Sequence, residues 1–466
     1  MTRSRRGPAS VERGLVETRI EYVGADGDGI GSPVIASAPA VIASEAKQSP
    51  AEETASSPSE LHGSHLYVPL TVPGDLVRVR PLSRRGDGWV AEIETLLEPG
   101  PGRREPVCAH FGVCGGCTSQ HWDEASYLGW KTGRLSAALR RAGFDEPAMA
   151  PIARGSPGSR RRVDLAARRG EGGLTLGLHR ARGSEIVDLT ECAVLHPELF
   201  ALVAPLRLAL SGLAAIRREA SVVVNLLDSG PDVLLRTDGD LITRDRTKLT
   251  DFARAHDLPR ISWARGTGTA EAVCVLRPSV TMLSGITVTP PPGAFLQATR
   301  EAEAAIIAAV LDGLPTKQTA RSRVLELFAG CGTISFALAE RIKVTAVEGD
   351  ETLVAACHNA INQAGLMGKI EARRRDLARQ PYQANELSGF TAVILDPPHA
   401  GAAAQMPAIA RAKVGTVIYV SCDPVSLGRD AAVLRGAGYR LEKVTPIDQF
   451  LWSARLEAVA VFRIGR

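Results

Sequence analysis

The sequence lacks any uninterrupted apolar run of about 18 residues, the length at which a membrane-spanning helix becomes possible. Its arginine-rich start also lacks the apolar stretch and the cleavage site of a secretory signal peptide. We therefore expect a cytoplasmic protein with no membrane partner.

The sequence contains few cysteines, and its net charge is small. The 466 residues include 8 cysteines, which we do not expect to form structural disulfides in a cytoplasmic chain, so their spacing must decide their role. The formal net charge of +4 identifies no partner. One stretch, Arg154 to Arg182, nevertheless holds eight arginines against only Asp164 and Glu171. That excess suits a polyanion and, equally, the solvated surface of a β-hairpin.

The composition is that of an ordinary soluble globular protein, with 45% hydrophobic and 23% charged residues. The chain is too long for one compact core, so we expect two or three domains. Short alternating patterns over residues 11–30 and 65–98, separated by glycine-containing turns, predict a small β-barrel within residues 1–100. Residues 31–62 are rich in Ala, Ser, Pro and Glu, which predicts a disordered insertion in the barrel.

The remaining chain predicts two further domains. Residues 101–290 begin with a cysteine-rich segment and then mix helical and strand patterns, which indicates an α+β central domain. Residues 291–466 alternate helical stretches with short apolar strands. This alternation predicts a doubly wound, mostly parallel, Rossmann-like sheet, so that the fold class is α/β.

A glycine-rich turn opens the last domain. The segment "VLELFAGCGTISFALAE" is a strand, a turn at Gly330 and Gly332, and a helix, and glycines let the backbone approach a nucleoside cofactor. The next strand ends in Glu348, where a carboxylate can accept hydrogen bonds from ribose hydroxyls. Dinucleotide-binding folds share this pattern, so NAD is the alternative, although the third glycine is absent. The form E-L-F-x-G-x-G resembles motif I of class I S-adenosylmethionine-dependent methyltransferases.

The segment "TAVILDPPHAG" ends a strand at Asp396 before two prolines. In methyltransferases that act on amino groups, an aromatic residue that stacks on the target base usually follows such a motif. His399 stands there instead, which disfavours methylation of an exocyclic amine.

Cys422 follows the next strand, in "VIYVSCDPVSLGRD". Asp423 can cap the following helix and Pro424 can be its first residue, so the thiol is expected beside a helix N-terminus whose dipole favours the thiolate. A cysteine can also be merely a buried apolar residue, but a cysteine at a strand end over a cofactor pocket indicates a nucleophile. Attack of sulfur on C6 of a pyrimidine makes C5 nucleophilic enough to accept a methyl group. A base must then remove the C5 proton, and Glu457 in the last strand is the best carboxylate available.

Together these segments resemble the RNA 5-methyluridine methyltransferase family. "SCDPVSLGRD" matches its "SCNPxTLARD"-like nucleophile motif, and "DPPHAG" matches its "DPPRxG"-like motif. The resemblance implies methylation of uridine C5 in tRNA or 23S rRNA, with Cys422 as the nucleophile and Glu457 as the base. It also implies contacts to S-adenosylmethionine from Gln297, Phe328, Glu348 and Asp396, with Asp376 near the adenine.

Three departures from the family pattern concern the predicted site. His399 replaces the usual Arg, Asp423 replaces the usual Asn, and "WSARLE" stands where the family has an "HTxHVE"-like run. The last of these makes the role of Glu457 less secure than that of Cys422. It also keeps open a non-catalytic RNA-binding protein that retains the fold. A cytosine-C5 enzyme is the other alternative, although the Pro-Cys pattern of its RNA-acting members is absent.

A second cysteine group lies in the central domain. Cys108, Cys114 and Cys117, with the distant Cys192, supply four thiolates, and their spacing alone suits either tetrahedral zinc or a 4Fe-4S cluster. The resemblance extends to the cluster-binding branch of the family and implies a 4Fe-4S cluster with a structural or RNA-positioning role. His110 and His121 would be candidate ligands only if that interpretation fails. We expect the other cysteines to be packing residues, namely Cys274, Cys331 and Cys357.

The N-terminal barrel resembles the small oligonucleotide-binding barrel called TRAM. We expect it to present basic side chains to RNA phosphates, namely Arg78, Arg80, Arg84 and Arg85. The target uridine must leave its stack to reach a thiol in a pocket, so the substrate is expected to be a loop or bulge whose base is flipped. A monomer is the default expectation.

Overall fold

The computed structural model describes residues 14–34 and 64–465. The chain divides into two compact units. The first comprises Met1–Val107, Cys117–Trp130 and Trp452–Ala454, and the second comprises Cys108–Gly116, Lys131–Leu451 and Arg455–Arg466, so far as these ranges are described. The predicted division into three domains, at residues 1–100, 101–290 and 291–466, stays a prediction.

The first unit is built around a closed five-stranded barrel, as the sequence predicts. Its strands follow the order β1-β2-β3-β5-β4, and antiparallel pairing of β1 with β4 closes it. They are β1 (Val16–Val23), β2 (Gly29–Val34), β3 (His65–Val68), β4 (Leu76–Arg85) and β5 (Gly88–Glu98). Alternate residues point inward, so that Ile20, Leu66, Val77 and Trp89 form its core. The predicted disordered insertion falls mainly on residues 35–63, outside the described residues, whereas residues 31–34 belong to β2.

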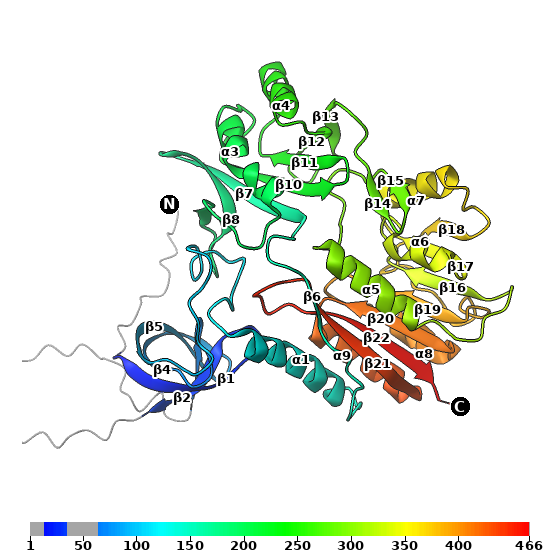
Figure 1. Ribbon diagram of the computed structural model, residues 1–466, viewed down its shortest axis with the longest axis horizontal. Helices are drawn as coiled ribbons and strands as arrows, with labels where there is room; N and C mark the ends of the chain where they lie inside the picture. The colour runs from blue at the N-terminus through cyan, green and yellow to red at the C-terminus, as the bar shows by residue number, and fades with distance from the viewer. Residues whose placement is uncertain (1–13, 35–63, 466) are drawn as a thin grey trace, which may run out of the picture. The chain divides into compact units, whose positions relative to one another are not determined.

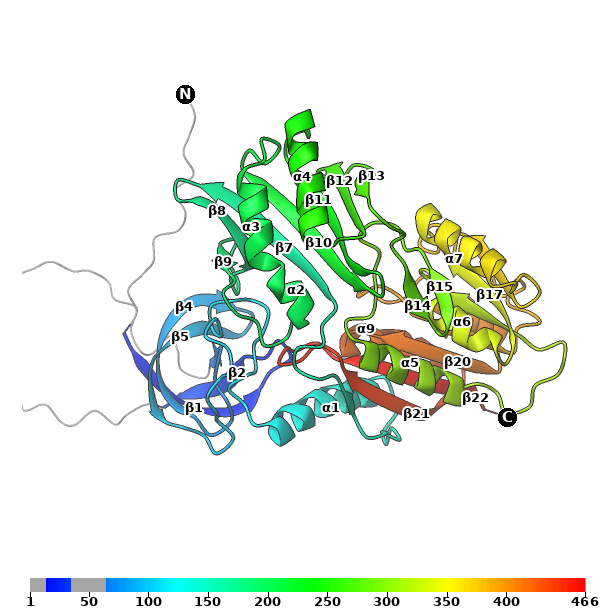
Figure 2. The ribbon, with the colours of Figure 1, turned by 45° about the horizontal axis from the view of Figure 1, so that its top comes forward.

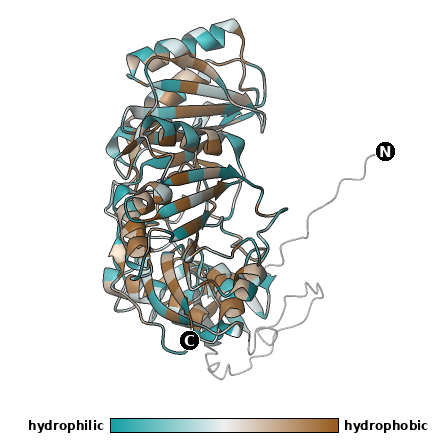
Figure 3. Ribbon diagram, turned by 90° about the vertical axis from the view of Figure 1, so that its right-hand side faces the viewer, coloured by the Kyte–Doolittle hydropathy of each residue, from teal (hydrophilic) through white to brown (hydrophobic). Residues whose placement is uncertain are grey.

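The second unit contains a seven-stranded sheet of order β13-β12-β11-β10-β7-β8-β9. Its strands are β7 (Arg162–Gly170), β8 (Gly173–His179), β9 (Ile186–Asp188), β10 (Glu219–Leu227), β11 (Gly230–Thr237), β12 (Arg260–Arg265) and β13 (Glu271–Val275). The helices α2 (Pro197–Ala201), α3 (Val203–Ser211) and α4 (Thr243–Ala255) contact one face of it, as Figure 2 shows. That face is apolar because alternate residues of each strand, such as Val163 and Leu165, point toward the helices. Hydrophobic and hydrophilic residues accordingly alternate along the strands in Figure 3.

The second sheet of this unit has eight strands in the order β18-β17-β16-β19-β20-β22-β21-β6. They are β6 (Ala153–Arg154), β16 (Arg323–Leu327), β17 (Lys343–Glu348), β18 (Ile370–Arg374), β19 (Ala392–Leu395), β20 (Thr416–Ser421), β21 (Tyr439–Asp448) and β22 (Glu457–Ile464). From β18 to β20 every pairing is parallel, and β22 runs antiparallel to both β20 and β21. A short hairpin of β14 (Thr281–Leu283) and β15 (Ile286–Val288) lies in the chain before β16.

Helices pack on both faces of this sheet (Figure 1). One face contacts α5 (Arg300–Asp312), α6 (Thr333–Ala339) and α7 (Glu351–Gln363), and the other contacts α8 (Met406–Ala412), α9 (Pro424–Gly436) and residues from Leu135 onward in α1 (Glu124–Arg141). Strands covered on both faces must be apolar throughout, which explains why β19 and β20 are buried along their whole length. The predicted doubly wound α/β fold is confirmed.

The strand order reverses at β16. The chain runs outward from β16 through β17 to β18 and then returns to β19 on the other side of β16. Ligands of open α/β sheets bind beside such a switch point, at the carboxyl ends of the strands. Among the described residues, the helices are either too short or too polar to cross a lipid bilayer.

Candidate active site

The predicted cofactor and catalytic residues collect at one edge of the eight-stranded sheet. Phe328 follows β16, Glu348 ends β17, Asp396 follows β19 and Cys422 follows β20. These four strands are parallel, so their carboxyl ends share an edge. The structure therefore brings together residues that lie far apart in the sequence.

Glu457 reaches the same edge from the opposite direction. It is the first residue of β22, whose antiparallel pairing matches Ala458 with Ser421. The residues next to that pair are Glu457 and Cys422, and the charge of Glu457 contributes to raising the pKa of the Cys422 thiol. The proposed base and nucleophile are thus neighbours, although the family-like run before Glu457 is altered.

The local structure around Cys422 agrees with the predicted strand-to-helix junction. Asp423 is the N-cap of α9, where its Oδ2 accepts a hydrogen bond from the Ser426 backbone N–H at 2.8 Å. Pro424 opens the helix, as predicted. His399 Nδ1 lies 3.8 Å from Asp423 Oδ2, so the two departures from the family motifs face each other.

The expectation that this helix end favours the thiolate is wrong for the protein without ligands. Burial and, to a smaller extent, the charges of Glu457 and Asp396 raise the pKa of Cys422 to about 11, although the charge of Arg455 opposes them. Burial and two neighbouring acids therefore outweigh the helix dipole. At neutral pH the Cys422 side chain is a thiol.

The two carboxyl groups at this edge also resist ionisation. Burial raises the pKa of Asp396 and of Glu457, and the charge of Asp396 raises the pKa of Glu457 further. Glu457 is only 3% exposed. Two acids placed this close together favour a state in which one of them keeps its proton.

A chain of side-chain amides connects these acids. Gln297 Nε2 donates to Asp396 Oδ2 at 3.3 Å, and Gln449 Nε2 donates to Gln297 Oε1 at 2.9 Å and to Glu457 Oε2 at 2.6 Å. Sequence reasoning missed Gln449. Its only signal was a position just after β21, a strand that ends at the same edge because it is antiparallel to β22.

The glycine-rich turn and Glu348 fit a nucleoside cofactor. The Glu348 carboxylate accepts backbone hydrogen bonds from Gly330 at 3.0 Å, Gly349 at 2.6 Å and Asp350 at 2.9 Å, which hold it at the strand end. Gly332 has a φ of 97°, and a Cβ there would lie 2.7 Å from the Phe336 ring. The turn therefore needs glycine, and a fixed, half-buried carboxylate beside it is suited to accept bonds from ribose hydroxyls.

Phe328 and Asp376 differ in how they are held. Phe328 has a φ of 65°, an unusual conformation for a residue with a side chain, at the start of the glycine-rich turn. Asp376 lies beyond β18 with its side chain 51% exposed, and its Oδ1 accepts bonds from the backbone N–H groups of Ala378 and Arg379, both at 3.1 Å. Asp376 therefore shapes the turn after β18.

The second cysteine group is only partly assembled. Cys108, Cys114 and Cys192 belong to the second unit, and Cys192 contributes to raising the pKa of both other thiols, whereas Cys117 belongs to the first unit. Within residues 14–34 and 64–465, no three His, Cys, Asp or Glu side chains are arranged to hold a metal ion. The four thiols have the chemistry for a cluster, and the cluster itself stays a prediction.

The remaining cysteines behave largely as packing residues. Cys331 and Cys357 are 3% and 2% exposed and belong to the same apolar core. Cys274 lies in β13, is half-buried, and packs against the apolar core between the seven-stranded sheet and its helices.

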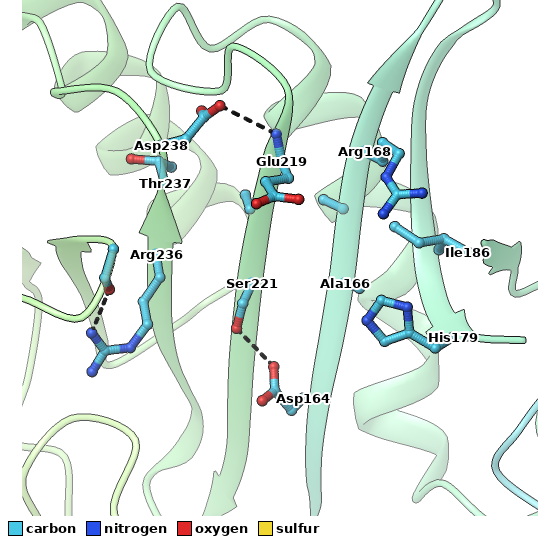
Figure 4. Close-up of a pocket in the computed structure, with 13 residues that line it drawn as sticks. Asp164, Ala166, Arg168, His179, Ile186, Glu219, Ser221, Arg236, Thr237 and Asp238 are labelled. Atoms are coloured by element: carbon cyan, nitrogen blue, oxygen red, sulfur yellow. Dashed lines mark hydrogen bonds between the residues drawn. The ribbon is translucent and has the colours of Figure 1, made fainter. Parts of the chain in front are cut away.

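Arginines of the Arg154 to Arg182 stretch divide between two roles. Arg161 is buried, pairs with Glu303 and donates to the carbonyl of Gln297 at 3.0 Å, and Arg169 donates to three backbone carbonyls, so both support the fold. The side chain of Arg168 has no hydrogen bond or ion pair with the residues that the structure describes, and it lines a hollow of about 450 Å³ on the seven-stranded sheet. Figure 4 shows Arg168 and His179 on neighbouring strands of that hollow, with Arg236 on its other side.

Most of the barrel arginines predicted to contact phosphates are paired with acids. Arg78 binds Glu17 at 2.7 Å and Arg80 binds Glu94 at 2.7 Å. Arg85 pairs with two aspartates, Asp26 and Asp28, and Arg84 lies over the ring of Trp89. These contacts stabilise the barrel and reduce the positive charge that it offers to RNA.

Comparison with known proteins extends over almost the whole chain. Residues 296–419 match a family model described as "Conserved hypothetical protein 95". An uncharacterised RNA methyltransferase of Brucella suis biovar 1 is 39% identical over 410 residues, which cover 88% of this chain and 95% of that protein. The 23S rRNA (uracil(1939)-C(5))-methyltransferase RlmD of Chromohalobacter salexigens is 34% identical over 412 residues, 85% of this chain and 84% of that protein.

A solved structure shares the fold. The Pyrococcus abyssi tRNA (uracil-54, C5)-methyltransferase in complex with S-adenosyl-L-homocysteine aligns with a TM-score of 0.66 and 21% identity, over 96% of this chain and 99% of that one. The extent and identity of the matched relatives are sufficient to show a shared family. The chain belongs to the RNA methyltransferase family that includes RlmD.

Proposed function

We propose that this RNA methyltransferase transfers a methyl group from S-adenosylmethionine to C5 of a uridine, with Cys422 as the nucleophile and Glu457 as the base. The observation that carries the proposal is the meeting of Cys422, Glu457 and Asp396 at one edge of the sheet, beside the glycine-rich turn. The relative RlmD, which acts on uracil C5, supports the same assignment.

The reaction requires Cys422 to lose its proton first. Asp396 and Glu457 are the acids whose charges act on that thiol, and whichever of them is ionised can accept the proton. The thiolate then attacks C6 of the uracil ring, a sulfur–carbon bond forms, and the electron pair of the C5–C6 double bond makes C5 nucleophilic. When bound, S-adenosylmethionine supplies an electrophilic methyl group on a positively charged sulfur.

Glu457 completes the reaction. Once C5 carries the methyl group, the Glu457 carboxylate removes the C5 proton, the C5–H electron pair restores the C5–C6 double bond, and the bond from C6 to sulfur breaks. Cys422 leaves as a thiolate, and the product is 5-methyluridine. We place Gln297, Phe328, Glu348 and Asp396 around the methyl donor, with Asp376 at the adenine end.

The test is a covalent trap. RNA containing 5-fluorouridine has no C5 proton to lose, so incubation with S-adenosylmethionine should leave the enzyme bound to RNA in a complex that survives denaturation. We expect Cys422→Ala to abolish both this complex and the incorporation of labelled methyl groups. Methylation by the Cys422→Ala variant would refute the assignment of Cys422 as the nucleophile. Absence of methylation by the wild type would favour a non-catalytic RNA-binding protein.

The RNA substrate is proposed to be ribosomal or transfer RNA. Mass-spectrometric mapping of 5-methyluridine in RNA from a strain lacking the gene would identify the position. The same map would distinguish uridine from cytosine as the target.

We also propose that the hollow at Arg168 contacts this RNA. Strand β7 carries Arg168 in the hollow and Arg162 six residues earlier on the same face, and Arg161 contacts the backbone of Gln297 in the site. An arginine without an acidic partner suits a phosphate. Arg168→Ala should weaken RNA binding and reduce its dependence on salt, whereas Arg254→Ala, on α4 and therefore on the helix-covered side of the sheet, should change neither.

The four predicted cysteine ligands, Cys108, Cys114, Cys117 and Cys192, are proposed to hold a 4Fe-4S cluster. The charge of Cys192 acts on both Cys108 and Cys114, which supports the proposal because it requires Cys192 to lie near each of them. Protein purified without oxygen should contain iron and acid-labile sulfide in equal amounts. Zinc without sulfide would instead support the tetrahedral alternative.

A further inference from the structure

Gln449 is a buried polar residue whose side chain makes three hydrogen bonds at the proposed site. It is 1% exposed and lies in the turn between β21 and β22. A glutamine buried to this extent must have its amide satisfied. The pattern of its bonds determines how that amide is oriented.

A backbone group fixes the orientation of Gln449. The N–H of Ala298 donates to Oε1 of Gln449 at 2.9 Å, and a backbone N–H can only donate, so the atom that it contacts must be the amide oxygen. Nε2 of Gln449 therefore faces Gln297 Oε1 and Glu457 Oε2 as a donor.

The same logic fixes the next amide. Because Gln449 donates to it, the contacted atom of Gln297 must be oxygen, and Nε2 of Gln297 is left to face Asp396 at 3.3 Å. One backbone N–H thus sets the direction of two side-chain amides. Both amides donate toward a carboxyl group.

The turn that carries Gln449 is held on both sides. Lys131 Nζ donates to Asp448 Oδ1 at 2.5 Å and to the carbonyl of Phe450 at 3.0 Å. The side chains of Lys131 and Asp448 are both 0% exposed. Gln449 lies between these two anchored residues, so its position has little freedom.

The surroundings of Glu457 otherwise oppose its ionisation. Burial and the charge of Asp396, from the end of β19, both raise its pKa, and Cys422 at the end of β20 adds a second negative charge once it is a thiolate. The other charged groups nearby are the Lys131–Asp448 pair and Arg455, which acts on Cys422. Gln449 provides the hydrogen bond that favours the carboxylate.

We infer that Gln449 is a positioning residue for proton removal: it stabilises the carboxylate form of Glu457, aims it at C5, and orients the Gln297 amide toward Asp396. The inference rests on the proposed function. It assigns to Gln449 the step in which the methylated adduct breaks down, because that step needs the base. Attack by Cys422 and methyl transfer do not need it.

The test uses Gln449→Met, which keeps the volume of the side chain and removes its donor. The matched control is Gln405→Met, because Gln405 is also fully buried and also anchors backbone groups, those of Tyr382 and Leu377, away from Glu457. The measurement is the rate at which the covalent enzyme–RNA adduct decays in a single turnover, from pH 6 to pH 10. The probes are in vitro transcribed 23S rRNA and unmodified tRNA.

Gln449→Met should raise the apparent pKa of adduct breakdown by roughly one unit, so that breakdown near neutral pH slows about tenfold and recovers at high pH. Gln405→Met should leave that pKa unchanged. Uniform slowing with an unchanged pH profile would overturn the inference and leave the proposed function standing. Absence of any adduct from the wild type would overturn both.

A second variant guards against a failure to fold. Gln449→Glu keeps an oxygen for the Ala298 N–H and places another acid against Glu457. Like charges repel, so the apparent pKa should rise further than in Gln449→Met. Infrared spectroscopy can follow the band of the protonated Glu457 carboxyl group, which is identified by its absence from Glu457→Gln. The pKa at which this band disappears should rise in the same order, from wild type to Gln449→Met to Gln449→Glu, without any turnover. An unshifted band in both variants would overturn the role of Gln449.

Discussion

At the scale of single residues, the proposed site contains two acids and a thiol whose pKa values are raised by burial. Cys422, Asp396 and Glu457 each favour the neutral form more than the same groups in water do. A positively charged methyl donor among them would partly reverse that preference. Reactivity is therefore expected to depend on ligand binding and on pH.

Glu457→Gln should separate the two halves of the reaction. The amide keeps the size of the side chain and cannot remove the C5 proton, so methyl transfer should proceed while release of product falls by about a hundredfold or more. Methylated RNA bound covalently to Cys422 should accumulate, which gel electrophoresis under denaturing conditions detects. Rapid release by this variant would assign the base to another group.

Alkylation of Cys422 should follow its raised pKa. With a pKa of about 11 the thiolate fraction is small at neutral pH, so modification by iodoacetamide should increase about tenfold per pH unit up to roughly pH 10. Peptide mass spectrometry can follow this cysteine among the eight in the chain. Asp396→Asn removes one neighbouring charge and should move the curve to lower pH. A half-maximum near pH 8 in the wild type would contradict the burial argument.

At the scale of elements, the glycine-rich turn between β16 and α6 determines the shape of the proposed cofactor pocket. Gly332→Ala should destabilise the protein by about 1 kcal/mol or more, since φ is positive there and the new Cβ would meet the Phe336 ring and the Cys357 sulfur. The control is Gly436→Ala in α9, where a Cβ meets nothing within 4 Å and alanine should be neutral or slightly stabilising. Urea unfolding measures both. Equal effects would show that the turn tolerates a side chain.

The sequence predicted the elements that end in the proposed site residues, because their strands are buried on both faces and therefore consist of apolar runs. Asp396 and Cys422 stand where those runs stop, next to prolines that end a strand or begin a helix. The pKa of Cys422 was mispredicted because the sequence shows the helix that follows it but not the two acids that come from other strands. Gln449 was missed for a related reason. Its partners Gln297 and Glu457 are brought to it by the insertion of β22 between β20 and β21, which no local pattern reveals.

At the scale of the whole molecule, buried acids should make stability fall as pH rises. Burial raises the pKa of Glu326 from 4.5 to about 8, and those of Asp396 and Glu457 are also raised. Between pH 4.5 and 8 the folded state holds more protons than the unfolded state, so the free energy of unfolding should decrease with pH across this range. Urea unfolding at pH 6 and pH 8 checks this. Glu326→Gln should flatten the decrease, and an identical slope in that variant would show that Glu326 does not contribute.

The division of the chain into two units also concerns the whole molecule. The barrel was predicted because alternating patterns and glycine turns are local signals, whereas no local signal shows that Trp452–Ala454 join the first unit from the far end of the chain. Four cysteines spread over both units could be recognised from their spacing. The cluster that this spacing predicts stays a prediction, because the ligand geometry of a metal site forms together with the metal.

The backbone N–H of Ala298 orients the amides of Gln449 and Gln297. Ala298 directly precedes Thr299, which is the N-cap of α5. Gln297 is hydrogen-bonded to Asp396, which we place at the methyl donor, and to Gln449, which is hydrogen-bonded to the proposed base Glu457. Under the proposed function, occupancy of the donor pocket and protonation of Glu457 would be thermodynamically linked, and such linkage is reciprocal. Binding of S-adenosylmethionine would then favour the carboxylate form of Glu457 before RNA binds. In turn, the affinity of the enzyme for the demethylated donor would depend on whether Glu457 has taken up the C5 proton.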